Sequence, residues 1–158
     1  MAHWYTGKGE RIRFDEIISQ IKEHSMDNGT TYIGTDSFFK KQDCVFSTAI
    51  CLYGANKQRG GRYFFRKNKV PKKNFPNLFV RMLKEAEKTI KLGQKIVDIC
   101  NITSLRIELH LDISDADAGE GTSNLTNMLV GYVKGSGFDC KIKPDAFAAA
   151  SIADKHSK

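Results

Sequence analysis

Hydrophobic residues recur with two different periods along the chain, and the change from one period to the other predicts the order of strands and helices. Alternating or continuous β-prone runs predict strands at residues 31–39, 44–53, 62–67, 104–112 and 138–143. Hydrophobic residues spaced three or four positions apart predict helices at residues 14–24, 78–97, 122–135 and 146–156. The last helix is expected to open at Pro144 and Asp145, because proline and a capping residue favour a first turn.

The order of these elements predicts the fold class. After a leading helix the order is β-β-β-α-β-α-β-α. The first three strands are joined by short turns and are expected to pair as an antiparallel meander, whereas the later strands alternate with helices. This order indicates an α/β fold with a mixed five-stranded sheet and helices on both faces. We expect residues 1–29 to be an N-terminal helical extension packed on the core, and residues 30–158 to be the main domain.

Composition places the chain among soluble globular proteins. Of its 158 residues 41% are hydrophobic, which excludes a disordered chain, and the hydrophobic runs are too short to cross a membrane. The four cysteines lack Cys-x-x-Cys spacing, so we expect buried thiols in a reducing compartment. Residues 1–13 lack the hydrophobic stretch of a signal peptide. We therefore expect a cytoplasmic location and no membrane partner.

The excess of positive charge favours a polyanionic partner. The formal net charge is +7, and Lys and Arg are concentrated at residues 57–73, where Tyr63, Phe64 and Phe65 separate them. Basic residues interleaved with aromatic ones are typical of nucleic-acid binding, since they neutralise phosphates and stack on bases. Ordinary alternation along one strand, with the charges simply in solvent, would produce the same pattern.

Acidic residues lie at the predicted ends of several elements. Asp36 closes the first strand, Asp112 closes the fourth, and Asp145 opens the last helix. Because sites in open α/β sheets form beyond the strand ends, these carboxylates can meet at one edge, joined by Glu85 or Glu87 from the long helix. Clustered carboxylates repel one another, and a divalent cation relieves the repulsion. Oxygen ligands without a zinc-type His or Cys pattern favour Mg²⁺ or Mn²⁺ as the cofactor.

The element order and the carboxylate positions together resemble the ribonuclease H-like superfamily, from about residue 30 to the C-terminus. Three segments resemble, more narrowly, the YkuK family of predicted ribonuclease H-related nucleases: Tyr32–Ser37 (Tyr-Ile-Gly-Thr-Asp-Ser), Glu108–Asp112 (Glu-Leu-His-Leu-Asp) and Lys143–Lys155. This resemblance implies a ribonuclease H-like domain at residues 30–158. It also implies a divalent-metal-dependent nuclease that hydrolyses the phosphodiester bonds of DNA, RNA or their hybrid.

The same resemblance implies roles for four acidic residues. Asp36 would be the central metal ligand, Asp112 the second ligand from a strand, and Asp145 the ligand at the start of the last helix. Glu85 would be the fourth catalytic acid, because Arg81 stands four residues before it in an Arg-x-x-x-Glu pattern associated with the family.

Several alternatives stay open at this point. Asp154 competes with Asp145, which also suits an N-cap, and Glu87 competes with Glu85 on the same helix. His110 shares a strand face with Asp112 and is expected to be either a proton carrier or a half-buried strand histidine. The remaining candidates are two lysines that can contact phosphate and the residues of an acidic loop near the site: Lys143, Lys155, Asp115, Asp117 and Glu120.

Two other functions fit part of the pattern. A catalytically silent ribonuclease H-like module would keep the fold and bind nucleic acid without a complete metal site. An actin-like phosphotransferase would share the first strand and its aspartate, but 158 residues leave no room for the duplicated domain that closes on ATP. The type of nucleic acid, endo- or exonucleolytic cleavage and the oligomeric state are left open by the sequence.

Overall fold

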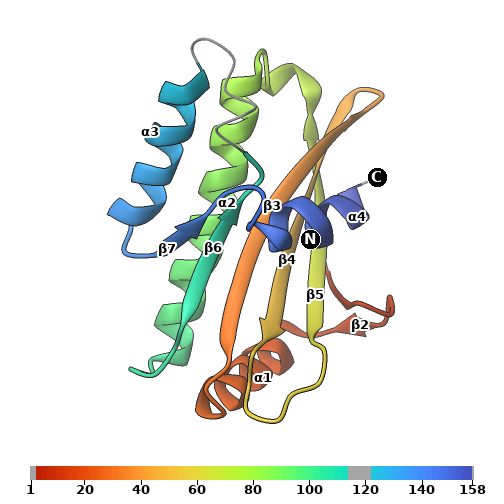
Figure 1. The fold of residues 1–158 in the computed structure, drawn as a ribbon. Helices are drawn as coiled ribbons and strands as arrows, with labels where there is room; N and C mark the ends of the chain where they lie inside the picture. The colour runs from red at the N-terminus through yellow and green to blue at the C-terminus, as the bar shows by residue number, and fades with distance from the viewer. Residues whose placement is uncertain (1–2, 114–121, 158) are drawn as a thin grey trace.

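The computed structural model describes residues 3–113 and 122–157, in which most elements lie where the periodicity predicts them (Figure 1). The strands are β1 (Trp4–Thr6), β2 (Arg11–Ile12), β3 (Thr30–Lys40), β4 (Asp43–Tyr53), β5 (Arg62–Pro71), β6 (Ile107–Leu111) and β7 (Asp139–Lys141). The helices are α1 (Phe14–Met26), α2 (Leu78–Cys100), α3 (Thr122–Gly135) and α4 (Asp154–Ser157), with a 3-10 turn η1 (Lys72–Asn74) and a π-helical segment η2 (Ala148–Ala153).

The strands form one mixed sheet in the order β2-β1-β5-β4-β3-β6-β7. The predicted meander is confirmed, since β4 is antiparallel to both β3 and β5. β6 lies parallel to β3, and β7 lies parallel to β6, as expected when strands are connected through helices. The α/β class is therefore confirmed, but the sheet has seven strands in the described part of the chain rather than five.

The two additional strands, β1 and β2, extend the sheet beyond β5. Trp4 of β1 pairs with Arg66 of β5, and the Arg66 guanidinium carbon lies 4.8 Å from the centre of the Trp4 ring. Strands of three and two residues contain too little alternation to be recognised from periodicity. The N-terminal residues thus add edge strands as well as α1, and a domain boundary at residue 30 stays a prediction.

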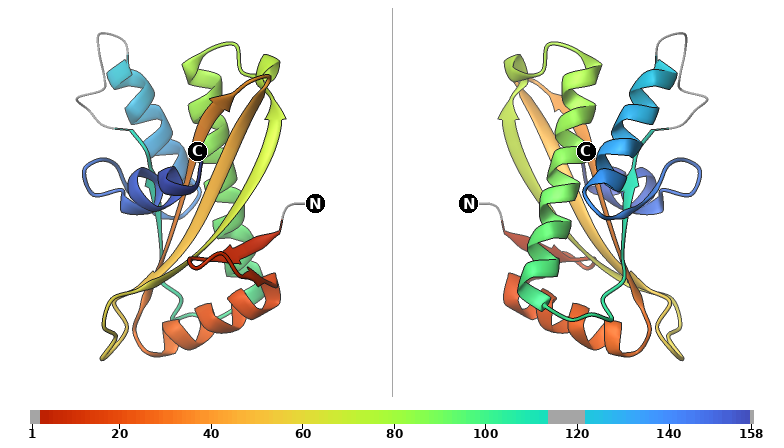
Figure 2. Two further views of the ribbon diagram at one scale, coloured as in Figure 1. Left: turned by 90° about the vertical axis from the view of Figure 1, so that its right-hand side faces the viewer. Right: turned by 90° about the vertical axis from the view of Figure 1, so that its left-hand side faces the viewer.

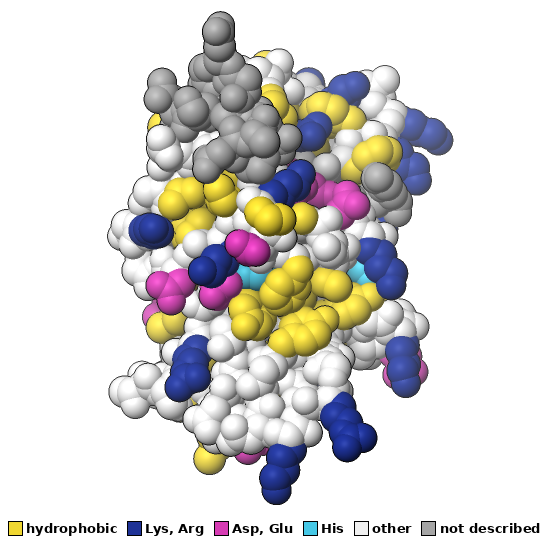
Figure 3. Space-filling view, in the orientation of Figure 1, with side chains coloured by type: hydrophobic (Ala, Val, Ile, Leu, Met, Phe, Trp, Pro, Cys, Tyr) yellow, Lys and Arg dark blue, Asp and Glu magenta, His cyan; other side chains and the backbone are white. Residues whose placement is uncertain are grey.

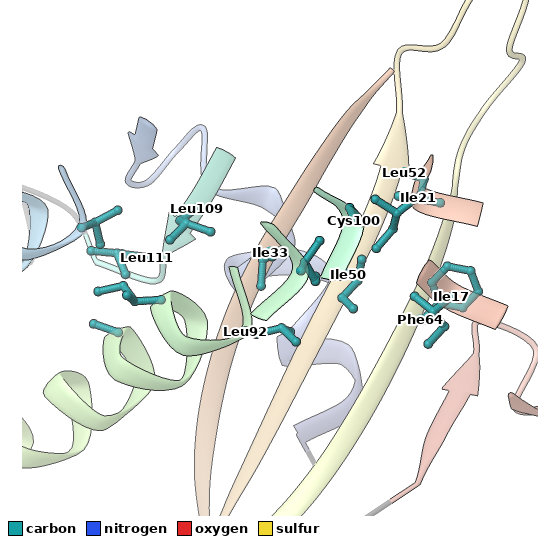
Figure 4. Packing of buried hydrophobic residues seen from close by; sticks show 14 of the residues in the cluster. Ile17, Ile21, Ile33, Ile50, Leu52, Phe64, Leu92, Cys100, Leu109 and Leu111 are labelled. Atoms are coloured by element: carbon teal, nitrogen blue, oxygen red, sulfur yellow. The ribbon is translucent and has the colours of Figure 1, made fainter. Parts of the chain in front are cut away.

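One face of the sheet carries the main hydrophobic core, beneath α1, α2 and α3 (Figure 2). Ile17 of α1, Ile96 of α2 and Leu129 of α3 are buried against the sheet together with Ile33 and Ile50. Figure 4 shows Ile33 and Ile50 of the sheet on the same side as Leu92 of α2 and Ile17 of α1. This layer holds α2, which carries one of the candidate acids, rigidly against β3.

The opposite face is crossed by η2 and α4, which we call the C-terminal segment (residues 148–157). It passes so close to β3 that a Cβ atom on Gly34 would lie 2.4 Å from the backbone nitrogen of Ala149 and 2.7 Å from the carbonyl carbon of Ala148. Glycine at this strand position therefore permits direct contact between the two backbones. The predicted placement of helices on both faces of the sheet is confirmed.

The last helix begins later than predicted. Asp145 lies in a turn, where its N–H donates to the carbonyl oxygen of Ile142 at 2.9 Å, and the helical segment starts only at Ala148. The predicted opening at Pro144 and Asp145 is wrong, because these residues complete a turn after β7 instead of a first helical turn. This shift decides which aspartate reaches β3.

All four cysteines are free thiols, and Cys44, Cys51 and Cys100 are buried, as expected. No helix in the described part of the chain has the length and hydrophobicity needed to cross a membrane. The predicted acidic loop residues Asp115, Asp117 and Glu120 lie outside the described residues.

Candidate functional site

Asp36 lies on β3 in the middle of the sheet, on the face that the C-terminal segment crosses. Its orientation follows from strand alternation, because Gly34, two residues earlier, packs against that segment. β3 pairs with β6 through Thr35 opposite Leu111, so the next residues, Asp36 and Asp112, lie side by side just beyond the end of β6. Only 7% of Asp36 is exposed to solvent.

Two other carboxyl groups contact Asp36. One belongs to Asp112, and the other to Asp154, the first residue of α4, which packs against β3, β4 and β5. The pKa of Asp36 is raised to about 8, first by burial and then by hydrogen bonds with the carboxyls of Asp154 and Asp112 and by their charges. At neutral pH this cluster therefore retains a proton unless a cation takes its place.

Glu85 of α2 approaches the cluster from the other side of the sheet. Its side chain is buried, and Ser37 Oγ donates a hydrogen bond to its Oε2. The pKa of Glu85 is raised to about 8, mainly by burial; the Ser37 hydrogen bond and Arg81 oppose the rise, and the charges of Asp36 and Asp112 add to it. Glu85 thus interacts with the same two aspartates and is held in place by a residue of β3.

Glu87, the alternative acid on α2, faces outward. Glu87 Oε1 forms ion pairs with Lys84 Nζ at 3.2 Å and Lys91 Nζ at 2.8 Å. The hydrogen bond from Lys91 and the one from Lys84 lower the pKa of Glu87, the reverse of the shift at Glu85. The structure therefore brings Glu85, and not Glu87, to the carboxylate cluster.

Asp112 has one oxygen that is ion-paired with Lys143 but accepts no hydrogen bond from the part of the chain that the structure describes. Its Oδ1 is buried and accepts no hydrogen bond from the described residues, although Lys143 Nζ lies 3.1 Å away. The short distance makes an ion pair, but a hydrogen bond also requires the donor to be well aligned. A buried carboxylate oxygen that accepts no hydrogen bond still has a lone pair with which it can bind a cation.

The structure does not bring Asp145 to the cluster. Asp145 is exposed in the turn before the C-terminal segment, and its charge acts on His110. The reason lies in where that segment crosses the sheet: Ala148 is fixed to His110 on β6, and only the residues that follow pass over β3. Asp154 therefore occupies the position that sequence analysis assigned to Asp145.

His110 links β6 to the C-terminal segment. It is fully buried, and the Ala148 N–H donates to its Nδ1 at 3.1 Å. Nδ1 is therefore the acceptor, and Nε2 carries the proton that is donated to Glu108 Oε1 at 2.9 Å. Burial lowers the pKa of His110, although Glu108 acts in the opposite sense. A neutral histidine with both ring nitrogens hydrogen-bonded fits a buried strand histidine with a structural role, and not a proton carrier.

The basic stretch at residues 57–73 is divided between the two faces of β5. Arg66 packs on Trp4, and burial lowers the pKa of its guanidinium. Lys67 is exposed and pairs in register with Ser47, which itself pairs with Asp36. Residues of β5 that alternate with Arg66, such as Lys67, therefore lie on the face that carries the carboxylates, whereas Arg66 lies on the opposite face.

Buried hydroxyl groups around Asp36 were not identified from the sequence. Ser47 is directly opposite Asp36 in the strand register, and its Oγ is buried without a hydrogen-bond partner among the described residues. On the other face, Thr89 Oγ1 donates to Thr35 Oγ1 at 2.9 Å, and Thr35 Oγ1 lies 3.1 Å from Thr48 Oγ1. Serine and threonine at neighbouring positions of two central strands are the signal that could have indicated this polar interior.

The donor chemistry of the cluster suits a hard divalent cation. Its oxygen atoms belong to carboxyl groups, and one of them, Asp112 Oδ1, accepts no hydrogen bond from the described residues. Burial is the main cause of the raised pKa values of Asp36 and Glu85, and the charges of neighbouring carboxyls, whose repulsion a cation would relieve, add to it. Within residues 3–113 and 122–157, however, no group of three or more His, Cys, Asp or Glu side chains is already placed to hold a metal ion. Small side-chain movements would have to accompany binding.

Comparison with known proteins gives two matches. A family model described as "Ribonuclease H-like" matches residues 13–158. The chain is also 25% identical over 172 residues to "Uncharacterized protein YkuK" of Bacillus subtilis (strain 168), covering 98% of this chain and 96% of that protein. Both matches include Asp36, Glu85, Asp112 and Asp154 within the aligned region.

Proposed function

Because the chain belongs to the ribonuclease H-like family, of the YkuK type, we propose that it is a divalent-metal-dependent nuclease with its active site at Asp36, Glu85, Asp112 and Asp154. The observation that carries the proposal is the contact of the Asp36 carboxyl with those of Asp112 and Asp154, with Glu85 buried on α2 close enough for the charges of Asp36 and Asp112 to act on it. A buried cluster of carboxyl groups lowers the stability of the fold, and carboxyl groups with strongly shifted pKa values are typical of functional sites.

Asp36, Asp112 and Asp154 would hold the cation, with Glu85 beside them, and either Mg²⁺ or Mn²⁺ fits their oxygen atoms. The bound cation would activate water and stabilise the charge that develops on the leaving oxygen. The chain itself orients these ligands: Ser37 holds Glu85, while His110 fixes the start of the segment that carries Asp154. Lys143, beside Asp112, is placed to contact a phosphate.

The test is cleavage of end-labelled single-stranded DNA, single-stranded RNA, duplex DNA and RNA–DNA hybrid in Mg²⁺ or Mn²⁺. The wild-type protein is expected to cleave at least one of them, and chelation with EDTA should stop cleavage. Asp36→Asn should abolish activity, since it removes the ligand that contacts both other aspartates.

The chain offers two matched control pairs for this assay. Asp154→Asn should abolish cleavage and Asp145→Asn should not; likewise Glu85→Gln should abolish it and Glu87→Gln should not. Cleavage that survives Asp36→Asn would refute the proposed site. If Asp145→Asn loses cleavage while Asp154→Asn keeps normal activity, the metal ligand is Asp145, in the turn before η2, and not Asp154.

A catalytically silent nucleic-acid-binding module is the second candidate, and it is favoured by the lack of a preformed metal group among the described residues. Calorimetric titration with Mn²⁺ separates the two functions. Binding that is lost in Asp36→Asn supports the nuclease, whereas no binding to the wild-type protein at millimolar Mn²⁺ supports the silent module.

A further inference from the structure

An aromatic surface lies on the same face of the sheet as the carboxylates, on the other side of the C-terminal segment. We call it the aromatic patch. It consists of four half-buried rings, three on β3, β4 and β5 and one directly before the C-terminal segment: Tyr32, Tyr53, Tyr63 and Phe147. The rings pack on the small buried residues Ala49, Cys51, Ala148 and Ala153, and Tyr32 and Phe147 also pack against the buried His110 ring. Figure 3, which looks onto this face, shows hydrophobic side chains gathered near its middle.

The rings of the patch form a continuous group. The centre of the Phe147 ring lies 4.9 Å from that of Tyr32 and 5.4 Å from that of Tyr53, and the Tyr32 and Tyr53 rings lie 6.4 Å apart. Tyr63 Oη lies 2.8 Å from His156 Nε2, which joins β5 to α4. The contacts hold each ring in place, so little side-chain freedom would be lost if a flat ligand stacked on the patch.

The patch lies at a fixed distance from the carboxylates. Tyr32 and Asp36 are on the same strand and the same face, four residues apart, so their Cα atoms are about 13 Å apart at the usual rise of a strand. The C-terminal segment passes between them, over Gly34. A chain of a few nucleotides could therefore have one phosphate at the carboxylates and its next bases on the aromatic patch.

The charges near the patch suit a polyanion on its β5 side. Lys67, which alternates with Arg66 along β5 and so lies on the face of Tyr63, is exposed, and so is Lys155 of α4. Figure 3 shows Lys and Arg side chains on both flanks of the hydrophobic area. Acidic Glu108 and Asp145 lie near the β6 side, which favours a path for the backbone over β4 and β5.

We propose that the aromatic patch binds the unpaired bases of a single-stranded nucleic acid, and so makes single strands the substrate class of the proposed nuclease. This inference rests on the proposed function, which it deepens. Aromatic side chains on an open sheet face stack on bases irrespective of sequence, whereas bases inside a duplex are stacked on one another and unavailable. Nearby Lys and Arg add affinity through the phosphates.

The test is fluorescence anisotropy with labelled oligo(dT), oligo(rU) and a blunt DNA duplex, in EDTA, so that binding is measured without cleavage. The wild-type protein is expected to bind both single strands at least about tenfold more tightly than the duplex, with affinity that falls as salt rises. The oligo(dT) and oligo(rU) arms distinguish DNA from RNA. Tyr53→Leu should weaken single-strand binding about tenfold, the effect of one lost stacking contact.

Two variants keep this test decisive. Tyr53→Phe retains the ring and should bind like the wild type, which separates stacking from loss of the hydroxyl group. Tyr132→Leu removes an aromatic residue exposed on α3, away from the patch, and should also bind normally. Circular dichroism of each variant shows whether the fold is retained.

Equal affinity for single strands and duplex, or unchanged single-strand binding by a folded Tyr53→Leu protein, would overturn the inference. A dimer that dissociates in Tyr53→Leu, seen by sedimentation, would instead assign the patch to a second copy of the chain. None of these results depends on a metal ion, so they leave the Asp36→Asn cleavage test unaffected. Conversely, tight single-strand binding without any cleavage would support the patch and refute the nuclease.

Discussion

The carboxylate cluster should destabilise the metal-free protein, and Asp36→Asn should relieve that effect in a pH-dependent way. Burial and the neighbouring carboxyls raise the pKa of Asp36 from 3.8 to about 8. The folded state therefore binds this proton more tightly than the unfolded chain does, and its stability falls as the pH rises from about 4 to about 8. Asparagine has no charge to bury, so the variant does not undergo this loss.

The expected size follows from the shift. One pKa unit corresponds to about 1.4 kcal/mol, but solvent and the sharing of protons with neighbouring carboxyls reduce the full effect. We expect Asp36→Asn to be more stable than the wild type by about 2–3 kcal/mol at pH 9, and the two proteins to be nearly equal at pH 4. In a chain of this length, about 2–3 kcal/mol raises the midpoint of thermal unfolding by about 4–12 °C.

The measurement is urea unfolding of both proteins in EDTA at several pH values between 4 and 9. Asp98→Asn, which removes an exposed aspartate of α2, is the control and should show no pH-dependent gain. A constant difference between wild type and Asp36→Asn at all pH values would refute the electrostatic reasoning, as would a variant that is less stable at pH 9. Addition of Mn²⁺ should stabilise the wild type alone, since a ligand of the folded state shifts unfolding by mass action.

Three further predictions concern the packing around the site. Gly34→Ala should destabilise the fold by about 2–3 kcal/mol in urea unfolding, because the added Cβ would lie 2.4 Å from the backbone nitrogen of Ala149. Gly131→Ala is the control: an added Cβ would meet nothing within 4 Å, so this substitution should stabilise α3 by up to about 1 kcal/mol. His110→Leu should cost about 1–3 kcal/mol, because a buried backbone N–H of η2 loses its acceptor, and hydrogen exchange should become faster in residues 148–157. Phe46→Ala should cost about 3–5 kcal/mol in the same unfolding assay, because that ring is fully buried against Cys44 and Phe75, and a cost below 1 kcal/mol would contradict this packing.

Periodicity predicts the elements that have enough residues to express it. The long helix α2 and the three strands of the meander were predicted within a few residues, because each is ten or more residues long and is rich in buried or β-prone positions. β1 and β2 were missed, since three and two residues show no period and β1 joins the sheet through β5, about sixty positions away in the chain. The structure places Asp36 in contact with Asp112, with Glu85 near enough for their charges to act on it, and each of the three lies on, or directly after, a strongly periodic element; their roles as ligands stay a prediction.

The choice between Asp145 and Asp154 depends on a contact that no local pattern contains. The two residues lie on either side of Ala149 at similar separations along the chain. Pro144 makes Asp145 resemble the start of a helix. Which one reaches Asp36 is decided by the direction in which that segment crosses the sheet, from β6 toward β5. The one indication in the sequence is Gly34, because a glycine inside a central strand signals close approach of another backbone. A segment that touches β3 two residues before Asp36 and continues toward β5 must place its later aspartate, Asp154, next to the buried carboxyl.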